Sequence, residues 1–421
     1  MANLTISDIT ATLREILLPY VKNNFPKQTI LLDQLKRNAG VTPMNDEFVA
    51  PIYTTRHGGV ANLANDSNNI ISSGGRDTSR ATVPVEIVTG ALNISKLAID
   101  ASRSNTLAVQ NNLTAQTTTL AEDFARQVNR QLYNDGIGVV SKVRTTGGSV
   151  GTGTVAVEAI TASVDDGRTQ DWYGTVNGDI SPTKYFAVDQ VIGVGTAGAA
   201  LGTITAVTGT SVVSGAPTAI VTAAEDAVYI LDGSGAGAGT AELLGIRAAL
   251  SSSTGTSTYA GLARNTVGWT PNFGSVSEAL TLKRMTGSYT AAKEYAAKDD
   301  KYIILVNQTL YNKYGDLLTA MRREVNETDL IGGFAGLSFV AGGGVVGVFL
   351  DYDVPDGEVL LINLSTWTIC QVSEIDWMGG QEEGSMLRLQ NSLIYQAVMH
   401  WFVNVLCLAP GANSKQTRKT A

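Results

Sequence analysis

The stretch EDFARQVNRQLYNDGIGVV, Glu122 to Val140, contains the clearest local signal in the sequence, the end of a long amphipathic helix. Apolar side chains recur here at three- and four-residue steps, as they do along the buried face of a helix. The stripe consists of Leu113, Thr117, Leu120, Phe124, Val128 and Leu132. Asn134-Asp135-Gly136 ends it, and Gly136 suits the left-handed conformation that often follows a helix. The pattern predicts a helix over residues 106–133.

Upstream of this helix, residues 48–90 contain two strand-like runs, Phe48 to Tyr53 and Ala81 to Val88. A long connection rich in Gly, Asn and Ser separates them. A two-stranded arm has too little apolar surface to be stable alone, so we expect it to lie on another subunit. Further upstream, apolar residues at helical spacing predict a helix over residues 6–24.

Downstream, residues 145–240 are dominated by Gly, Ala, Thr and Val, and short strand-like runs alternate with turns. This spacing predicts a small antiparallel barrel or sandwich. The segment contains VIGVGTAGAALG, Val191 to Gly202, which matches the G-x-G-x-x-G of a dinucleotide-binding turn. The residues after it favour a strand where that motif needs a helix, and no acid follows at the distance of a ribose ligand. We therefore interpret the glycines as a hairpin turn.

Residues 241–375 combine helical and strand patterns. Ser275 with Glu278 matches a capping box and predicts a helix from there to about Met285. The apolar run Tyr302 to Val306 predicts a buried strand, and Asn307 is placed to cap the helix that follows. Residues 358–372 have the pattern of one strand.

The last apolar run, LIYQAVMHWFVNVLCLA from Leu393 to Ala409, is compatible with two structures. Gln396, His400 and Asn404 are four residues apart, which would align them on one helix face. They also all occupy even positions while the odd positions are apolar, which is typical of a strand with one buried face. The strand fits at least as well. The polar tail Gly411 to Ala421 is predicted to be mobile.

The composition excludes several classes of protein. A net charge of −8 argues against a nucleic-acid reader, which would carry a basic patch. Two cysteines give no disulfide framework, and a reducing compartment is expected. The N-terminus lacks the pattern of a signal peptide, and no uncharged run reads cleanly as a membrane helix.

Candidate chemical groups are scattered along the chain. His57 and His400 have no further ligands at metal-binding spacing. The pair Glu382-Glu383 beside Gly384 is interpreted as a solvated turn, and the glycines 342–344 lack the Lys of a phosphate loop. Cys370 and Cys407 lie in apolar runs without a neighbouring cation to activate them. We predict no catalytic, cofactor-binding or metal site, and no enzyme activity.

The order of these parts resembles the major capsid proteins of tailed bacteriophages, which have the α+β Hong Kong 97-like fold. Four stretches carry the resemblance: FVAPIYTTRHGGVANLAND (48–66), EDFARQVNRQLYNDGIGVV (122–140), LSFVAGGGVVGVFLDYDVPDGEVLLINLSTW (337–367) and LIYQAVMHWFVNVLCLAP (393–410). The segment 145–240 departs from the minimal fold and resembles the inserted β-domain of some phage coat proteins by position and composition.

The resemblance implies a division of the chain into seven parts. They are an N-terminal arm (1–47), an extended loop on a neighbouring subunit (48–92), a peripheral domain with its spine helix (93–144), the inserted small antiparallel β-domain (145–240), an axial domain (241–375), a return to the peripheral domain (376–410) and the mobile tail (411–421).

The resemblance also implies a function. The chain would self-assemble into hexamers and pentamers of an icosahedral shell around the double-stranded DNA genome of a tailed phage, and would be found in the virion after assembly in the host cytoplasm. Scaffolding, portal and decoration proteins are the implied partners, with weak non-specific contact to the DNA and no membrane. The alternative is the shell of an encapsulin-like bacterial nanocompartment, which shares the fold. Some relatives crosslink through a lysine in the extended loop; since no lysine lies between Lys36 and Lys96, we predict no such crosslink.

Overall fold

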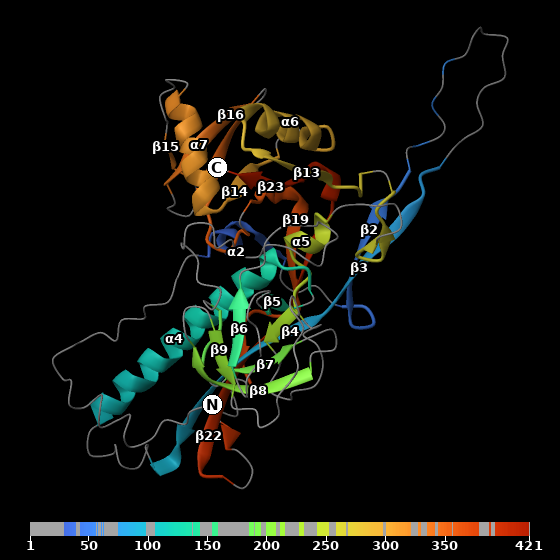
Figure 1. Ribbon diagram of the computed structural model, residues 1–421. Helices are drawn as coiled ribbons and strands as arrows, with labels where there is room; N and C mark the ends of the chain where they lie inside the picture. Colours follow the sequence, from blue (N-terminus) through green and yellow to red (C-terminus); the bar gives the residue numbers. More distant parts are fainter. Residues whose placement is uncertain are drawn as a thin grey trace.

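Two sheets, a barrel and a projecting arm make up the computed structural model (Figure 1). The structure describes most of the chain from Thr29 onward, and the helix predicted over residues 6–24 lies outside it. The described residues are 29–38, 43–55, 57, 60, 62, 75–97, 106–136, 138–143, 154–158, 185–188, 190–194, 199–207, 211–214, 227–230, 242–251, 258–266, 268–297, 300–320, 327–329, 335–341, 344–355, 357–378, 387–388 and 392–420.

The long strand β22 (Ile394–Cys407) organises the first, six-stranded sheet. It pairs antiparallel with β4 (Glu86–Ser95) along the whole of that strand. The remaining strands are β1 (Lys36–Asn38), β19 (Trp367–Gln371), β20 (Asp376–Trp377) and β21 (Leu387–Arg388). From Ala397 to Val405 every odd position of β22 is buried, so the strand interpretation of this run is confirmed.

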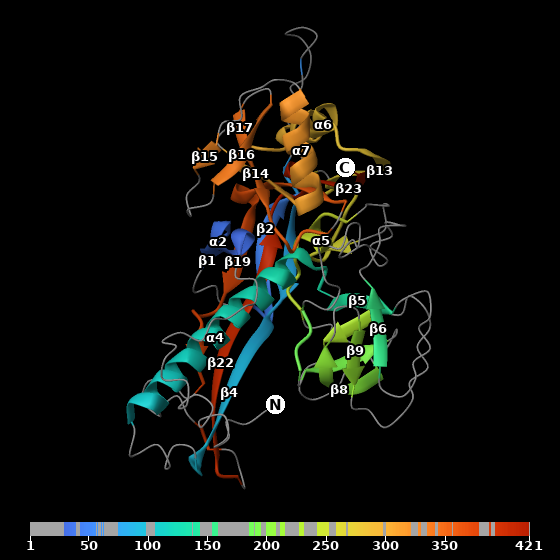
Figure 2. The same ribbon diagram turned by 60° about the vertical axis from the view of Figure 1, so that its left-hand side comes forward.

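Helix α4 (Thr106–Tyr133) packs along one face of this sheet, as Figure 2 shows. Phe124, Val128 and Leu132 are all buried, as the periodicity predicted. The chain then turns at Gly136, whose φ of 86° is the left-handed conformation expected there. The short helix α2 (Ile30–Gln34) adds three buried apolar side chains to the same core.

The second sheet has seven strands in the order β13-β23-β18-β14-β17-β16-β15. Its strands are β13 (Asn272–Ala279), β14 (Tyr302–Val306), β15 (Glu327–Asp329), β16 (Ala335–Ala341), β17 (Gly344–Leu350), β18 (Val359–Asn363) and β23 (Ser414–Thr420). Helices α6 (Leu282–Lys293) and α7 (Gln308–Ala320) cover one face and share a core with it. Asn307 Oδ1 accepts from the Leu310 backbone N–H at 3.0 Å, which confirms the predicted cap.

The predicted capping box at Ser275 and Glu278 is wrong. Both residues lie in β13, and α6 begins later, at Leu282, where Thr281 accepts from the backbone N–H of Arg284. The local motif is outweighed because β23 supplies β13 with a parallel partner strand from the far end of the chain. Glu278 pairs instead with Arg284 and Lys419.

The predicted mobile tail is also wrong. Residues 414–420 form β23, which lies between β13 and β18 and pairs with both. The short 3-10 turn η2 (Pro410–Ala412) leads into it. Lys415, Thr417 and Lys419 are almost completely buried, which a polar sequence alone does not suggest.

The single strand expected over 358–372 is interrupted. The side chain of Asn363 accepts from the Ser365 backbone N–H, and a 3-10 turn, η1 (Leu364–Thr366), separates β18 from β19. The chain crosses from the seven-stranded sheet to the six-stranded one at this turn. β19 therefore pairs with β1 and β22, although the sequence placed it in the axial segment.

Six short strands close into an antiparallel barrel beside α4 (Figure 2). They are β5 (Val139–Val143), β6 (Thr154–Glu158), β7 (Val191–Val194), β8 (Ala199–Val207), β9 (Ser211–Ser214) and β10 (Ala227–Ile230). The barrel thus begins a few residues before position 145. Val194 of β7 pairs with Ala199 of β8, so a strand stands where a dinucleotide site needs a helix. Gly195 and Gly198 themselves lie outside the described residues.

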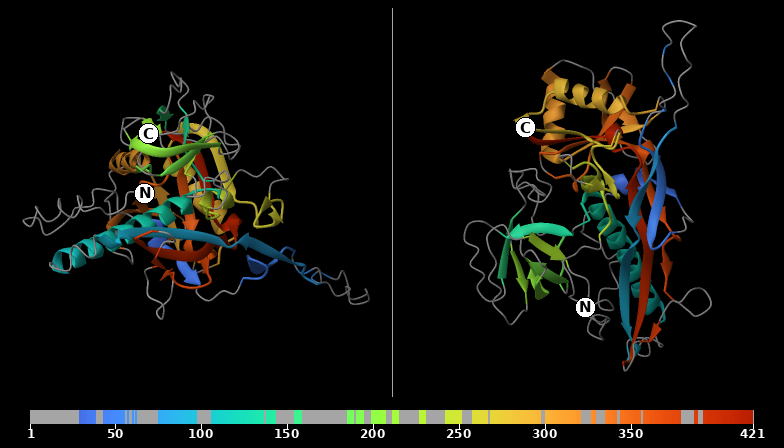
Figure 3. Two further views of the ribbon diagram at one scale, coloured as in Figure 1. Left: turned by 90° about the horizontal axis from the view of Figure 1, so that it is seen from below. Right: turned by 90° about the vertical axis from the view of Figure 1, so that its right-hand side faces the viewer.

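The arm consists of β2 (Glu47–Tyr53) and β3 (Thr78–Pro84), paired antiparallel along their full length. It leaves the body between the two sheets and projects past the seven-stranded sheet (Figure 3, right). β4 follows β3 almost directly and belongs to the six-stranded sheet, so the arm ends before residue 92.

Candidate assembly surface

The arm is buried most deeply at its inner end, although Ile52, near the outer end, also packs against the main core. Phe48, Ala81 and Val83 are at most 1 % exposed and pack into the main core. Tyr53, at the outer end, is 64 % exposed. There the contacts are local: the Arg76 guanidinium lies 5.1 Å from the Tyr53 ring, and the Asp77 backbone N–H donates to Thr55 at 2.9 Å. A ribbon with both faces in water is marginal, so its outer half is available for another surface.

A small hairpin, β11 (Thr258–Tyr259) and β12 (Leu262–Ala263), holds the base of the arm. The Thr82 backbone N–H donates to the Ala260 carbonyl at 2.9 Å. Gly261, at φ 76°, completes the turn, and a Cβ there would lie 3.0 Å from Thr82 Oγ1. The hairpin is fixed in turn, because the Tyr259 hydroxyl accepts from the Cys407 backbone N–H at 2.9 Å. The direction in which the arm leaves the body is therefore set by packing.

The face of the six-stranded sheet that points away from α4 is only partly covered by the described residues. His400, Val398 and Phe402 of β22 lie on it and are half-buried, and Ile87 of β4 is 56 % exposed. The His400 ring stands edge-on to Phe402 at 5.2 Å between centroids. This face combines apolar and polar side chains, which suits contact with another protein surface.

A buried polar junction joins α4, the barrel and the seven-stranded sheet. Asp353, in the loop after β17, accepts from Asn129 of α4 at 2.6 Å and from the Tyr185 hydroxyl. Tyr185 leads into the barrel, and its ring also faces the Arg126 guanidinium at 5.4 Å. The neighbouring Asp351 accepts from the Tyr133 hydroxyl at 2.7 Å. Burial, followed by these two carboxylates, raises the pKa of Tyr133 well above its usual range, so it stays a neutral donor.

An ion pair completes the junction at the end of α4. Arg130 and Glu242 are both buried and form a salt bridge. Glu242 also accepts from the Asn134 side chain at 2.6 Å. Sequence analysis missed this cluster, whose partners are more than a hundred residues apart. The one available signal was the run Asp351-Tyr352-Asp353, two acids beside the apolar strand β17.

The C-terminal strand is held by a second buried cluster. Glu358 accepts from Arg247 at 3.1 Å and from Lys415 at 3.0 Å, and all three are buried. Just before the strand, Asn413 Oδ1 accepts from the Asn363 backbone N–H at 2.8 Å and from the Trp367 indole at 3.0 Å. These contacts fix β23 relative to both sheets.

Glu86, where the arm joins β4, gives a testable pH dependence. Burial raises the pKa of its carboxyl from 4.5 to about 7. In the unfolded chain the Glu86 carboxyl ionises near pH 4.5, whereas in the folded state it ionises only near pH 7. Its contribution to the stability of the folded state is therefore fully present below about pH 4.5 and is lost as the pH rises through 7. Glu86→Gln should therefore raise the melting temperature relative to wild type more at pH 8 than at pH 4.5. Glu47→Gln, at an exposed carboxylate, is the control; equal shifts for both variants at both pH values would contradict this reading.

The other candidate groups of the sequence are the cysteines, the possible metal ligands and the pair Glu382-Glu383. Burial raises the pKa of the Cys370 thiol to about 11 and that of Cys407 to about 12, which leaves both unreactive. No three His, Cys, Asp or Glu side chains among the described residues gather as metal ligands. Glu382 and Glu383 lie outside those residues. None of the described helices has the length and apolarity needed to cross a bilayer.

Comparison with known proteins places the fold. No protein-family model matches the chain, and no curated protein matches its sequence. Among solved structures, a chain of the cyanophage A-1(L) capsid asymmetric unit matches with a TM-score of 0.54 and 13 % identity, covering 96 % of both chains. The SrpI encapsulin from Synechococcus elongatus PCC 7942 matches at 0.47, with 9 % identity over 99 % of this chain and 97 % of that one. The capsid of the native GTA particle matches at 0.45, with 10 % identity over 99 % and 100 %.

The first of these matches extends over almost the whole of both chains. The chain has the fold of a phage capsid chain, and the resemblance to the Hong Kong 97-like capsid proteins of tailed phages is confirmed at the level of the fold.

Proposed function

We propose that this chain is the major capsid protein of a tailed phage. Hexamers and pentamers of it would build an icosahedral shell around the double-stranded DNA genome, with assembly in the host cytoplasm. The observation that carries this proposal is the arm, whose inner end is buried in the core while Tyr53 at its outer end is largely exposed. The half-covered face of β4 and β22 is a surface on which the arm of a neighbouring copy could lie.

The same proposal assigns roles to the other parts. The seven-stranded sheet is the axial domain, the six-stranded sheet with α4 is the peripheral domain, and the barrel is an insertion. The net charge of −8 favours weak, non-specific contact with packaged DNA, because tight phosphate neutralisation needs a basic surface. Scaffolding, portal and decoration proteins remain proposed partners, and the proposed role is structural, not enzymatic.

Electron microscopy of the purified protein tests the proposal. Wild type should form capsomers or hollow icosahedral shells, and boiled particles should run as a single monomer band on a denaturing gel. A variant in which Tyr53 is joined to Thr78 through Asn-Gly, a two-residue hairpin turn, keeps the buried base of the arm. It should stay folded, with the wild-type circular dichroism spectrum, and form no shells. A wild type that remains a monodisperse monomer would refute the proposal. Shells that recruit a bacterial enzyme and never DNA would favour a nanocompartment.

A further inference from the structure

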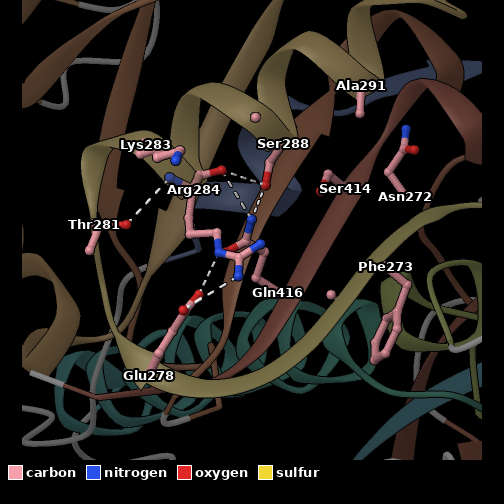
Figure 4. A pocket seen from close by; sticks show the side chains of 12 residues that line it. Asn272, Phe273, Glu278, Thr281, Lys283, Arg284, Ser288, Ala291, Ser414 and Gln416 are labelled. Atoms are coloured by element: carbon pink, nitrogen blue, oxygen red, sulfur yellow. Dashed lines mark hydrogen bonds and ion pairs between the residues drawn. The ribbon is translucent and has the colours of Figure 1, made fainter.

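A groove of about 640 Å³ lies between α6 and the strands β13 and β23 (Figure 4). Gly287, Ser288 and Ala291 form its helical wall, while Phe273 and Gln416 come from the two strands. β13 is an outer strand of its sheet, so the groove runs along an edge of the axial domain. Its volume lies within the range of binding pockets, about 300–1,000 Å³.

Gly287 is unexplained by the packing of its own chain. It lies in the interior of α6, where glycine is less favourable than alanine. A Cβ at this position would meet nothing within 4 Å, so no described residue demands its absence. Together with Ser288 and Ala291 it leaves a shallow wall that an outside backbone can approach closely.

Gln416 supplies an independent observation. The residue is 9 % exposed, and its Nε2 donates to the Arg284 carbonyl at 3.2 Å and to Ser288 Oγ. Its Oε1 is buried and has no hydrogen-bond partner among the described residues. A buried acceptor without a hydrogen bond destabilises the subunit, and a donor from outside the subunit would satisfy it.

The charge of the groove indicates what approaches it. Lys283 is exposed at the rim, and Glu278 is the single acid of the lining. That acid is already shared by Arg284 at 2.6 Å and Lys419 at 2.9 Å. The groove is thus locally basic, although the net charge of the chain is −8. Charge complementarity therefore favours another copy of this acidic chain as the binding partner over a basic protein.

We propose that this groove is the contact surface for an acidic segment of a second copy of the chain, within the ring of axial domains that the proposed shell requires. A backbone or side-chain donor of that segment satisfies Gln416 Oε1, and an acid of it pairs with Lys283. The contact is heterologous, because the groove of one copy meets a different surface of the next, and such contacts generate closed rings. The inference rests on the proposed shell function.

Filling the groove tests the contact without disturbing the subunit. Gly287→Trp places a large side chain where the chain leaves open space, and should abolish capsomers while the melting temperature stays at or above wild type. Thr286→Trp, at the neighbouring exposed position, lies about 100° around α6 and outside the groove lining, so it is the matched control and should assemble normally. Normal assembly of Gly287→Trp would overturn the inference and leave the shell function intact. Absence of any wild-type oligomer would overturn both.

Crosslinking identifies the occupant. Carbodiimide coupling of wild-type assemblies mixed from isotopically labelled and unlabelled subunits should join the Lys283 amine to an acidic peptide of another copy. Lys283→Glu should lower the yield of capsomers about tenfold at low salt, as expected for roughly 1.4 kcal/mol per contact, whereas Lys301→Glu should not. Crosslinks that never join a labelled to an unlabelled chain, or equal yields for both lysine variants, would overturn the proposal.

Discussion

Replacing Arg130 by methionine is expected to lower the free energy of unfolding of the unassembled subunit by about 3–5 kcal/mol. Arg130 is 2 % exposed and neutralises Glu242, which is itself buried at the end of α4. Methionine has a similar volume, so it fills the space but leaves a buried carboxylate with only the Asn134 amide as donor. Chemical denaturation followed by circular dichroism measures the effect.

A double-mutant cycle separates the charge from the packing. Glu242→Gln alone leaves the Arg130 guanidinium buried without its counter-ion, and should also destabilise strongly. Combining Arg130→Met with Glu242→Gln removes both charges, and the amide can still accept from Asn134. The loss in the free energy of unfolding of the double variant should be at most half of the sum of the losses of the two single variants. Strict additivity would show that the two side chains do not form a buried pair.

The position of this ion pair explains why its effect should extend beyond α4. Glu242 begins the segment that returns from the barrel toward the seven-stranded sheet. Asn129, one residue before Arg130, donates a hydrogen bond to Asp353. Asp353 also accepts a hydrogen bond from the hydroxyl of Tyr185, which precedes the barrel strand β7. The C-terminal end of α4 thus contacts both the segments that flank the barrel and the loop after β17 of the seven-stranded sheet. A rotation of this helix end would break both sets of contacts. We expect Arg130→Met to weaken shell assembly more than an equally destabilising core substitution elsewhere.

The parts of the fold that could be predicted from sequence are those whose signal is local. The stripe of α4 and the alternation in β22 each repeat along one element, so the residues that set the structure lie within a few positions of one another. The cap at Asn307 is local in the same sense, since donor and acceptor are three residues apart.

The parts that could not be predicted depend on distant partners. The pair Asn129 and Asp353 is separated by 224 residues, and no periodicity connects them. Ser275 and Glu278 match a helix start locally, yet β23 converts them to strand. The groove beside α6 depends on Gln416, which comes from a segment that reads as a loose tail. The candidate surface was therefore visible in sequence only at the arm.

Removing residues 414–421 is expected to prevent the subunit from folding, although this segment reads as a dispensable tail. β23 lies between β13 and β18, so its deletion leaves backbone groups of both neighbours without partners. It also removes Lys415, which leaves the buried Glu358 with Arg247 alone. Water cannot take over the hydrogen bonds of a central strand in a sheet whose face is covered by helices. Each buried backbone group left unpaired costs free energy comparable to a lost hydrogen bond.

Soluble yield and limited proteolysis measure this effect. The truncated chain should be insoluble or cleaved rapidly throughout the seven-stranded sheet, while wild type should resist cleavage even after Lys415 and Lys419. Lys301→Ala, at an exposed lysine outside this strand, is the control, and its loss should be about 0.5 kcal/mol or less. A truncated chain that melts like wild type would mean that the tail is not part of the sheet.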